Sequence, residues 1–109
     1  MCSSDLIPTS GLQEDYNSMA AGSALKARRA IDLARQVVAI ELLLAAQALD
    51  FRAPLTPGRG SAAARAAVRE RISRLDRDRY LKADLDAALR LCEEGAVLAA
   101  VEAAIGPLE

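Results

Sequence analysis

Apolar residues recur at intervals of three and four along residues 16–49, the spacing of one face of an α-helix. Charged residues such as Arg28, Asp32 and Arg35 fall between the apolar positions. The pattern predicts one long helix with an apolar stripe. The stripe consists of Ala27, Ile31, Ala34, Val38, Leu42, Ala45 and Leu49.

The second half of this helix changes character. Residues 37–49 contain only Glu41 and Gln47 as polar side chains, so this part is apolar nearly all round and is typical of a bundle interior. It is too short and too acidic for the ~20 apolar residues of a membrane span. Because three short helices cannot surround it, we expect it to pack against further polypeptide or other subunits. Glu41 is then either buried with a partner or faces a cavity, since an unpaired buried carboxylate is costly, and the expected partner is an arginine in this chain or in trans.

Proline and glycine interrupt the pattern over residues 52–60, which predicts a loop. Ser61 is expected to cap a second helix. The apolar stripe of that helix is narrow, which predicts a surface position, and Glu70 with Arg74 has the spacing of a helical ion pair. The stripe consists of Ala64, Val68, Ile72 and Leu75.

Alternating charges at residues 76–80 separate the second helix from a third, which begins near Ala83 with Asp84 and Asp86 in its acidic first turn. A buried stripe of Leu85, Leu89 and Cys92 is expected. Gly95 predicts a stop, residues 96–105 a short last helix, and Gly106 with Pro107 its end. The chain is therefore expected to be all-α, with a long apolar central helix followed by two or three shorter helices.

Composition agrees with helices and excludes several kinds of site. Among 109 residues, 52% are hydrophobic, many of them alanine, and 3% are aromatic. No histidine is present, which excludes Ser-His-Asp and Cys-His catalysis and most zinc sites. Two cysteines cannot form a disulfide framework or a four-ligand metal site, so we expect no metal and a reducing cytoplasm. The formal net charge of -1 draws the chain toward neither nucleic acid nor anionic lipid.

The first residues raise a separate question. Residues 1–6 have neither a basic nor an apolar signal region and resemble a translated adaptor remnant, so we interpret them as a non-native leader and residues 7–109 as the helical region. After Pro8, Ser10 and Gln13 fit a capping box, which places Glu14 and Asp15 in a first helical turn. On sequence grounds alone, Glu14 is either an ordinary helix-start acid or part of a site.

Two other functions stay open on these grounds. A free-standing helical module could bind a partner helix through residues 37–49. The arginines of residues 59–79 suggest a weak nucleic-acid face, although Glu70, Asp76 and Asp78 interrupt the run. Cys92 lies on an apolar stripe and is interpreted as an inert core residue, because it has no histidine partner.

Residues 7–19, Ile-Pro-Thr-Ser-Gly-Leu-Gln-Glu-Asp-Tyr-Asn-Ser-Met, resemble the C-terminal region of the aromatic amino acid ammonia-lyases. The resemblance continues in order and spacing over the rest of the chain. It includes residues 39–43, 45–47, 49–52, 76–80 and 84–85.

The resemblance implies elimination of ammonia from an aromatic amino acid, with histidine favoured and phenylalanine or tyrosine as alternatives. It implies a methylidene-imidazolone electrophile formed from Ala-Ser-Gly, a sequence that this chain lacks. Thr9-Ser10-Gly11 is a superficial match and is not assigned that chemistry. The chain is therefore expected to be an inactive fragment by itself, part of a cytoplasmic homotetramer that assembles through residues 16–50.

The resemblance also implies the site residues. Glu14 occupies the position of a glutamate beside the substrate in histidine-type lyases, where a carboxylate can stabilise positive charge. Glu14 is thus the expected catalytic and substrate-binding residue, Gln13 supports the pocket wall, and Asp15 anchors the helix start. Tyr16 and Asn17 depart from the histidine-type pattern, and Asn17 before Ser18 is similar to phenylalanine-type enzymes, which keeps the other substrates open.

Overall fold

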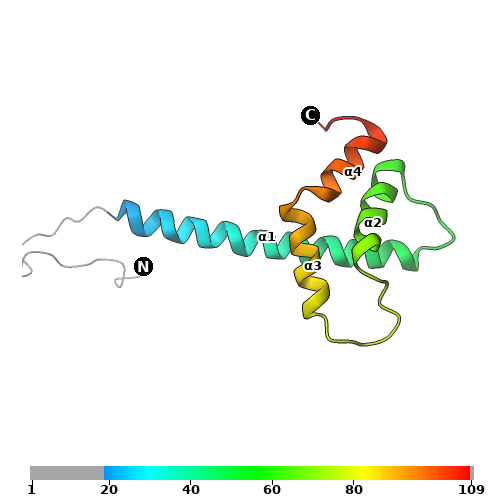
Figure 1. Ribbon diagram of the computed structural model, residues 1–109, viewed down its shortest axis with the longest axis horizontal. Coiled ribbons are helices and arrows are strands. Elements are labelled where there is room, and N and C mark those ends of the chain that lie inside the picture. The colour runs from blue at the N-terminus through cyan, green and yellow to red at the C-terminus, as the bar shows by residue number, and fades with distance from the viewer. Residues whose placement is uncertain (1–18, 109) are drawn as a thin grey trace, which may run out of the picture. The chain divides into compact units, whose positions relative to one another are not determined.

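A computed structural model describes residues 19–108, which form four helices (Figure 1). They are α1 (Ala20–Phe51), α2 (Arg59–Arg71), α3 (Lys82–Glu93) and α4 (Ala96–Ile105). No strand occurs in this range, so the all-α prediction is confirmed. No helix in the described part of the chain has the length and apolarity to cross a membrane. The chain divides between Leu33 and Ala34 into two compact units, and the second holds the core.

Helix α1 begins later than the apolar spacing predicts. Met19 is not helical, and its carbonyl accepts the first hydrogen bond, from the Ser23 N–H at 2.8 Å. The predicted capping residues Ser10 and Gln13 lie outside the described residues. At the other end α1 stops at Phe51, two residues before Ala53, whose place ahead of Pro54 disfavours helix.

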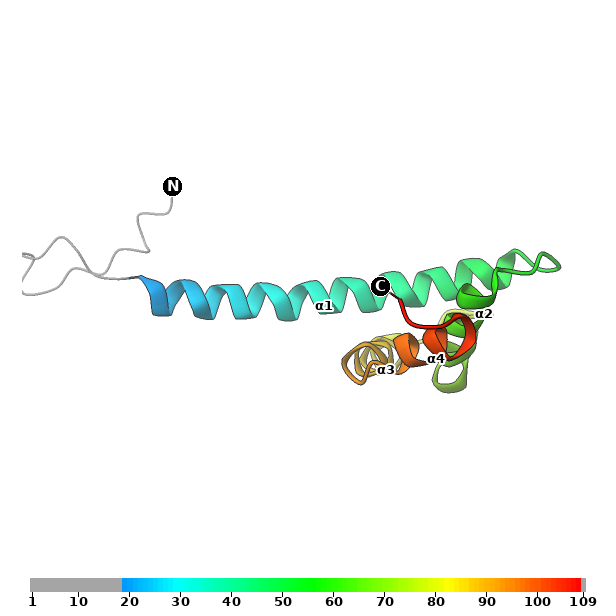
Figure 2. The same cartoon turned by 90° about the horizontal axis from the view of Figure 1, so that it is seen from above.

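The core lies between the second half of α1 and the shorter helices, which Figure 2 shows on one side of this part of α1. Alanine on α1 lets the other helices approach closely, because interaxial distance depends on side-chain size. Leu42 and Leu43 pack partly buried against this core, whereas the other large apolar side chains of residues 37–44 stay more than two-fifths exposed: Val37, Val38, Ile40 and Leu44. The prediction that three helices cannot surround α1 is therefore confirmed. The buried cluster is Ala39, Ala46, Val68, Ile72, Ala88 and Leu91.

Helix α2 differs from the prediction in the residue at which it begins and in its burial against the core. It begins at Arg59 with Gly58 at the cap, so Ser61 does not cap it. Gly60, in the first turn of α2, lies close to α4, because a Cβ atom added at this glycine would be 3.2 Å from the Ile105 side chain. Val68 is fully buried, which makes the predicted surface position wrong. The narrow stripe faces the core, while other sides of α2 contact α4 and α3.

Two predictions of side-chain placement are also wrong. Helix α2 ends at Arg71, so Arg74 lies beyond it and pairs with Asp76 at 3.1 Å instead of with Glu70. On α3 the fully buried residues are Ala88 and Leu91, while the predicted stripe of Leu85, Leu89 and Cys92 is only partly buried. The apolar residues of α3 are compatible with two rotations of the helix about its axis, one that buries the predicted stripe and one that buries Ala88 and Leu91. Packing against Ala39 and Val68 selects the second.

The last two helix boundaries are confirmed. Gly95 adopts φ 68°, a left-handed conformation that glycine tolerates best, and it separates α3 from α4. Helix α4 covers residues 96–105 as predicted, and Gly106 ends it with φ 94°. These helix ends depend on the backbone conformation of single glycine residues, which is why they could be predicted from the sequence.

Leu91→Ala is expected to lower the free energy of unfolding by about 2–5 kcal/mol, because it leaves a cavity among buried side chains. Leu91 is 1% exposed, whereas Leu98 on α4 is 51% exposed and serves as the matched control. Leu98→Ala should cost less than about 1 kcal/mol. Urea denaturation followed by circular dichroism measures both, and equal losses would contradict the assignment of Leu91 to the core.

Candidate functional site

The predicted site residues Gln13 and Glu14 lie outside the described residues, so their roles stay predictions. Glu41, for which burial beside an arginine was expected, is exposed. It forms no ion pair within residues 19–108, so burial in this chain is wrong and a partner in trans stays a prediction.

The buried carboxylate is instead Asp50, near the end of α1, with 3% of its side chain exposed. Arg65 donates from Nε to Oδ1 at 2.6 Å, and Arg69 donates from Nε to Oδ2 at 2.8 Å. The two arginines are one helical turn apart on α2, so both reach the same carboxylate. This double ion pair fastens α2 to the end of α1.

The same network continues into the segment that follows α2. Arg69 also donates to the Gln47 side-chain oxygen at 3.2 Å and to the Ile72 carbonyl at 3.1 Å. Gln47 then forms two hydrogen bonds of 3.1 Å with the Leu75 backbone, one as acceptor and one as donor. No buried side-chain nitrogen or oxygen in the described part of the chain lacks a hydrogen bond. The network therefore fixes the register of α2 against α1.

Two opposing effects act on the pKa of Asp50. Burial raises the pKa, because it disfavours the charged carboxylate, but hydrogen bonds and the charges of Arg65 and Arg69 outweigh it. The net pKa lies below the ordinary value of an aspartic acid. Asp50 is therefore held as a carboxylate, and its role in the structure is to fix the arginines.

Sequence reasoning missed Asp50, although a signal existed. Arg65 and Arg69 share a face of α2, and an acid at the end of an otherwise apolar helix is a natural partner for both. Other arginines of residues 59–79 also pair within the chain: Arg71 with Glu94 at 2.7 Å and Arg79 with Asp84 at 2.9 Å. These pairs neutralise much of the charge that a nucleic-acid face would need.

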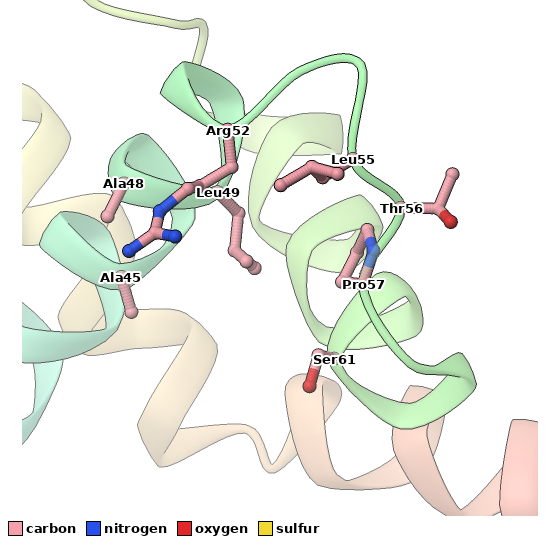
Figure 3. A pocket seen from close by; sticks show the side chains of 8 residues that line it. All are labelled: Ala45, Ala48, Leu49, Arg52, Leu55, Thr56, Pro57 and Ser61. Carbon is pink, nitrogen blue, oxygen red and sulfur yellow. The ribbon is translucent and has the colours of Figure 1, made fainter.

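An open groove lies between the end of α1, the loop that follows it and the first turn of α2, with a volume of ≈ 500 Å³ (Figure 3). In Figure 3 the Arg52 side chain extends back along α1 toward Ala48 and Ala45. The groove can accept apolar surface together with a negative charge, because its walls are mostly apolar and Arg52 is cationic. The lining residues are Ala45, Ala48, Leu49, Arg52, Leu55, Thr56, Pro57 and Ser61.

No metal-binding cluster occurs among residues 19–108. No three histidine, cysteine, aspartate or glutamate side chains in this range converge as metal ligands. Burial and the neighbouring Glu93 charge raise the pKa of Cys92, which keeps it a thiol and agrees with an inert residue.

The aromatic amino acid lyase family model matches residues 1–70. The chain is 49% identical over 100 residues to a histidine ammonia-lyase of Myxococcus xanthus, covering 92% of this chain and 20% of that protein. It is 50% identical over 105 residues to a histidine ammonia-lyase of Symbiobacterium thermophilum, covering 96% of this chain and 21% of that protein. The chain thus spans about a fifth of the length of these curated relatives.

No solved structure matches the chain. The range matched by the family model includes residues 1–6, and their interpretation as a leader stays a prediction.

Proposed function

Because the chain belongs to the aromatic amino acid lyase family, we propose that it is the C-terminal part of an enzyme that eliminates ammonia from histidine to give urocanate. The observation that carries this proposal is the 50% identity to a histidine ammonia-lyase over 96% of the chain. Phenylalanine and tyrosine are the alternative substrates, because Tyr16 and Asn17 depart from the histidine-type pattern.

The reactive group of this enzyme would lie on other polypeptide. The methylidene-imidazolone of the family forms from Ala-Ser-Gly, and no such tripeptide occurs among these residues. The chain therefore does not fit that group and should have no lyase activity by itself. Its proposed contribution is Glu14, supported by Gln13, at one side of a composite pocket, where a carboxylate would stabilise the positive charge of the substrate.

The second proposed contribution is to assembly. Val37, Val38 and Leu44 are 55%, 55% and 62% exposed on α1, an amount of apolar surface that favours burial against other polypeptide. We propose that residues 16–50 join a homotetramer. A cytoplasmic location would keep Cys2 and Cys92 reduced.

A chimera tests the proposal. Residues 7–109 replace the corresponding region of the Myxococcus xanthus histidine ammonia-lyase, and urocanate formation is followed by ultraviolet absorbance. We expect histidine turnover by the chimera and none by the same enzyme truncated before that region. A folded, assembled chimera that turns over neither histidine, phenylalanine nor tyrosine would overturn the proposal and favour the helical interaction module.

A further inference from the structure

A second stripe runs along the outer side of α1, roughly opposite the core. Its positions recur at three and four, the spacing of a helix–helix seam. Every residue in it is exposed. The core-facing stripe, which contains Ala39, Ala46 and Asp50, is buried. We define the outer seam as Val38, Glu41, Ala45 and Ala48 on α1 together with Arg52, which directly follows the last residue of this helix.

The two charges of the outer seam lie at its ends. Glu41 and Arg52 are eleven residues apart, which is about three helical turns. Arg52 follows the last residue of α1, and its N–H still donates to the Leu49 carbonyl at 3.2 Å, so the two residues lie near the same side of the helix. Their separation along the helix is about 16 Å, too far for them to pair with each other. Neither forms an ion pair with any residue in the range 19–108.

We propose that the outer seam binds a second copy of this chain in an antiparallel arrangement, with each Glu41 paired to the second copy's Arg52. A two-fold axis between Ala45 and Ala48 produces both ion pairs at once, because an antiparallel isologous contact exchanges equivalent positions. A parallel contact would place Glu41 on Glu41 and Arg52 on Arg52. Charge complementarity therefore selects the antiparallel orientation.

The apolar positions of the seam fit the same arrangement. The axis places Ala45 against the second copy's Ala48, and these small side chains let the two helices approach closely. Val38, 55% exposed, lies one turn before Glu41 and adds apolar area to the seam. Leu55, 69% exposed, lies in the loop after α1 and forms a wall of the ≈ 500 Å³ groove beside Ala45 and Ala48, so it adds apolar surface next to the seam.

The expected roles of apolar burial and charge differ. Burial of alanine, valine and leucine supplies the favourable free energy of association. The exposed ion pairs add little affinity and instead fix orientation and register. The inference deepens the assembly part of the proposed function and rests on it, and it adds a specific contact between subunits.

Sedimentation equilibrium of the full chain tests the contact with charge-reversal variants. Glu41→Arg alone and Arg52→Glu alone should each weaken self-association about tenfold or more, because each creates two like-charge contacts in the dimer. An equimolar mixture of the two variants should regain the wild-type dissociation constant, because the mixed dimer again has two ion pairs: one of the original sign, between Arg52 of one copy and Glu41 of the other, and one of reversed sign, between the two substituted residues. Glu93→Arg is the matched control, since Glu93 is exposed on α3 outside the seam and should leave association unchanged.

Three results would overturn the inference: a monomeric wild-type chain, equal association of all variants, or a mixture no stronger than the single variants. Circular dichroism of each variant confirms that its helices are intact. Histidine turnover by the chimera is measured separately, so any of these three results together with retained turnover would refute the seam and keep the lyase proposal.

Discussion

Asp50→Ala is expected to lower the free energy of unfolding by about 3–5 kcal/mol, because it leaves two arginines without the buried carboxylate they share. Arg65 is 42% exposed and can turn toward water, but Arg69 is only 16% exposed and would keep an uncompensated charge. Urea denaturation followed by circular dichroism measures the loss. Low, equal protein concentrations are needed, since self-association would add to apparent stability.

The matched control is an ion pair of the same chemistry at the surface. Asp76 is 74% exposed and Arg74 is 47% exposed, so solvent screens their attraction. Asp76→Ala should cost about 0–1 kcal/mol. If both aspartate variants lose stability equally, Asp50 has no special role in fastening α2 to α1.

The same carboxylate should make stability depend on pH. The pKa of Asp50 is lower in the folded chain than in the unfolded chain, so its contribution is fully present above the unfolded pKa of about 4. The contribution is lost as pH falls from there through the folded pKa. Asp50→Asn, which cannot ionise, should therefore reduce the loss of stability on acidification, and an unchanged pH profile would contradict the double ion pair.

Glu14→Ala is expected to reduce the kcat/KM of the chimera for histidine by about 100-fold or more, if Glu14 stabilises charge at the substrate. Glu14→Gln should lose less, because an amide oxygen accepts a hydrogen bond but carries no charge. Steady-state kinetics measures both variants. Size-exclusion chromatography should show unchanged assembly.

Asp15→Ala separates this role from that of a helix-start acid. Glu14 and Asp15 occupy the same predicted first turn, so a contribution to the helix dipole would appear about equally in both. Kinetics unaffected by Glu14→Ala would assign Glu14 to the helix start alone. A large loss for Glu14 with a small loss for Asp15 would support its place beside the substrate.

The sequence determined those features that depend on a residue and its near neighbours. Periodicity predicted the long helix, and its nearly all-round apolarity over residues 37–49 predicted that part of it would stay uncovered. Gly95 and Gly106 located two helix ends, because left-handed backbone favours glycine. The ordered motifs also led to the lyase family, which the family model confirms.

The tertiary structure alone decided which side chains meet across helices. Sequence singled out Glu41 as the acid in need of an arginine, whereas the structure pairs Asp50 with Arg65 and Arg69. Packing also moved the start of α2 to Arg59 and selected the rotation of α3. The physical reason is that several pairings satisfy the same local pattern, and only distance and burial in the folded chain distinguish them.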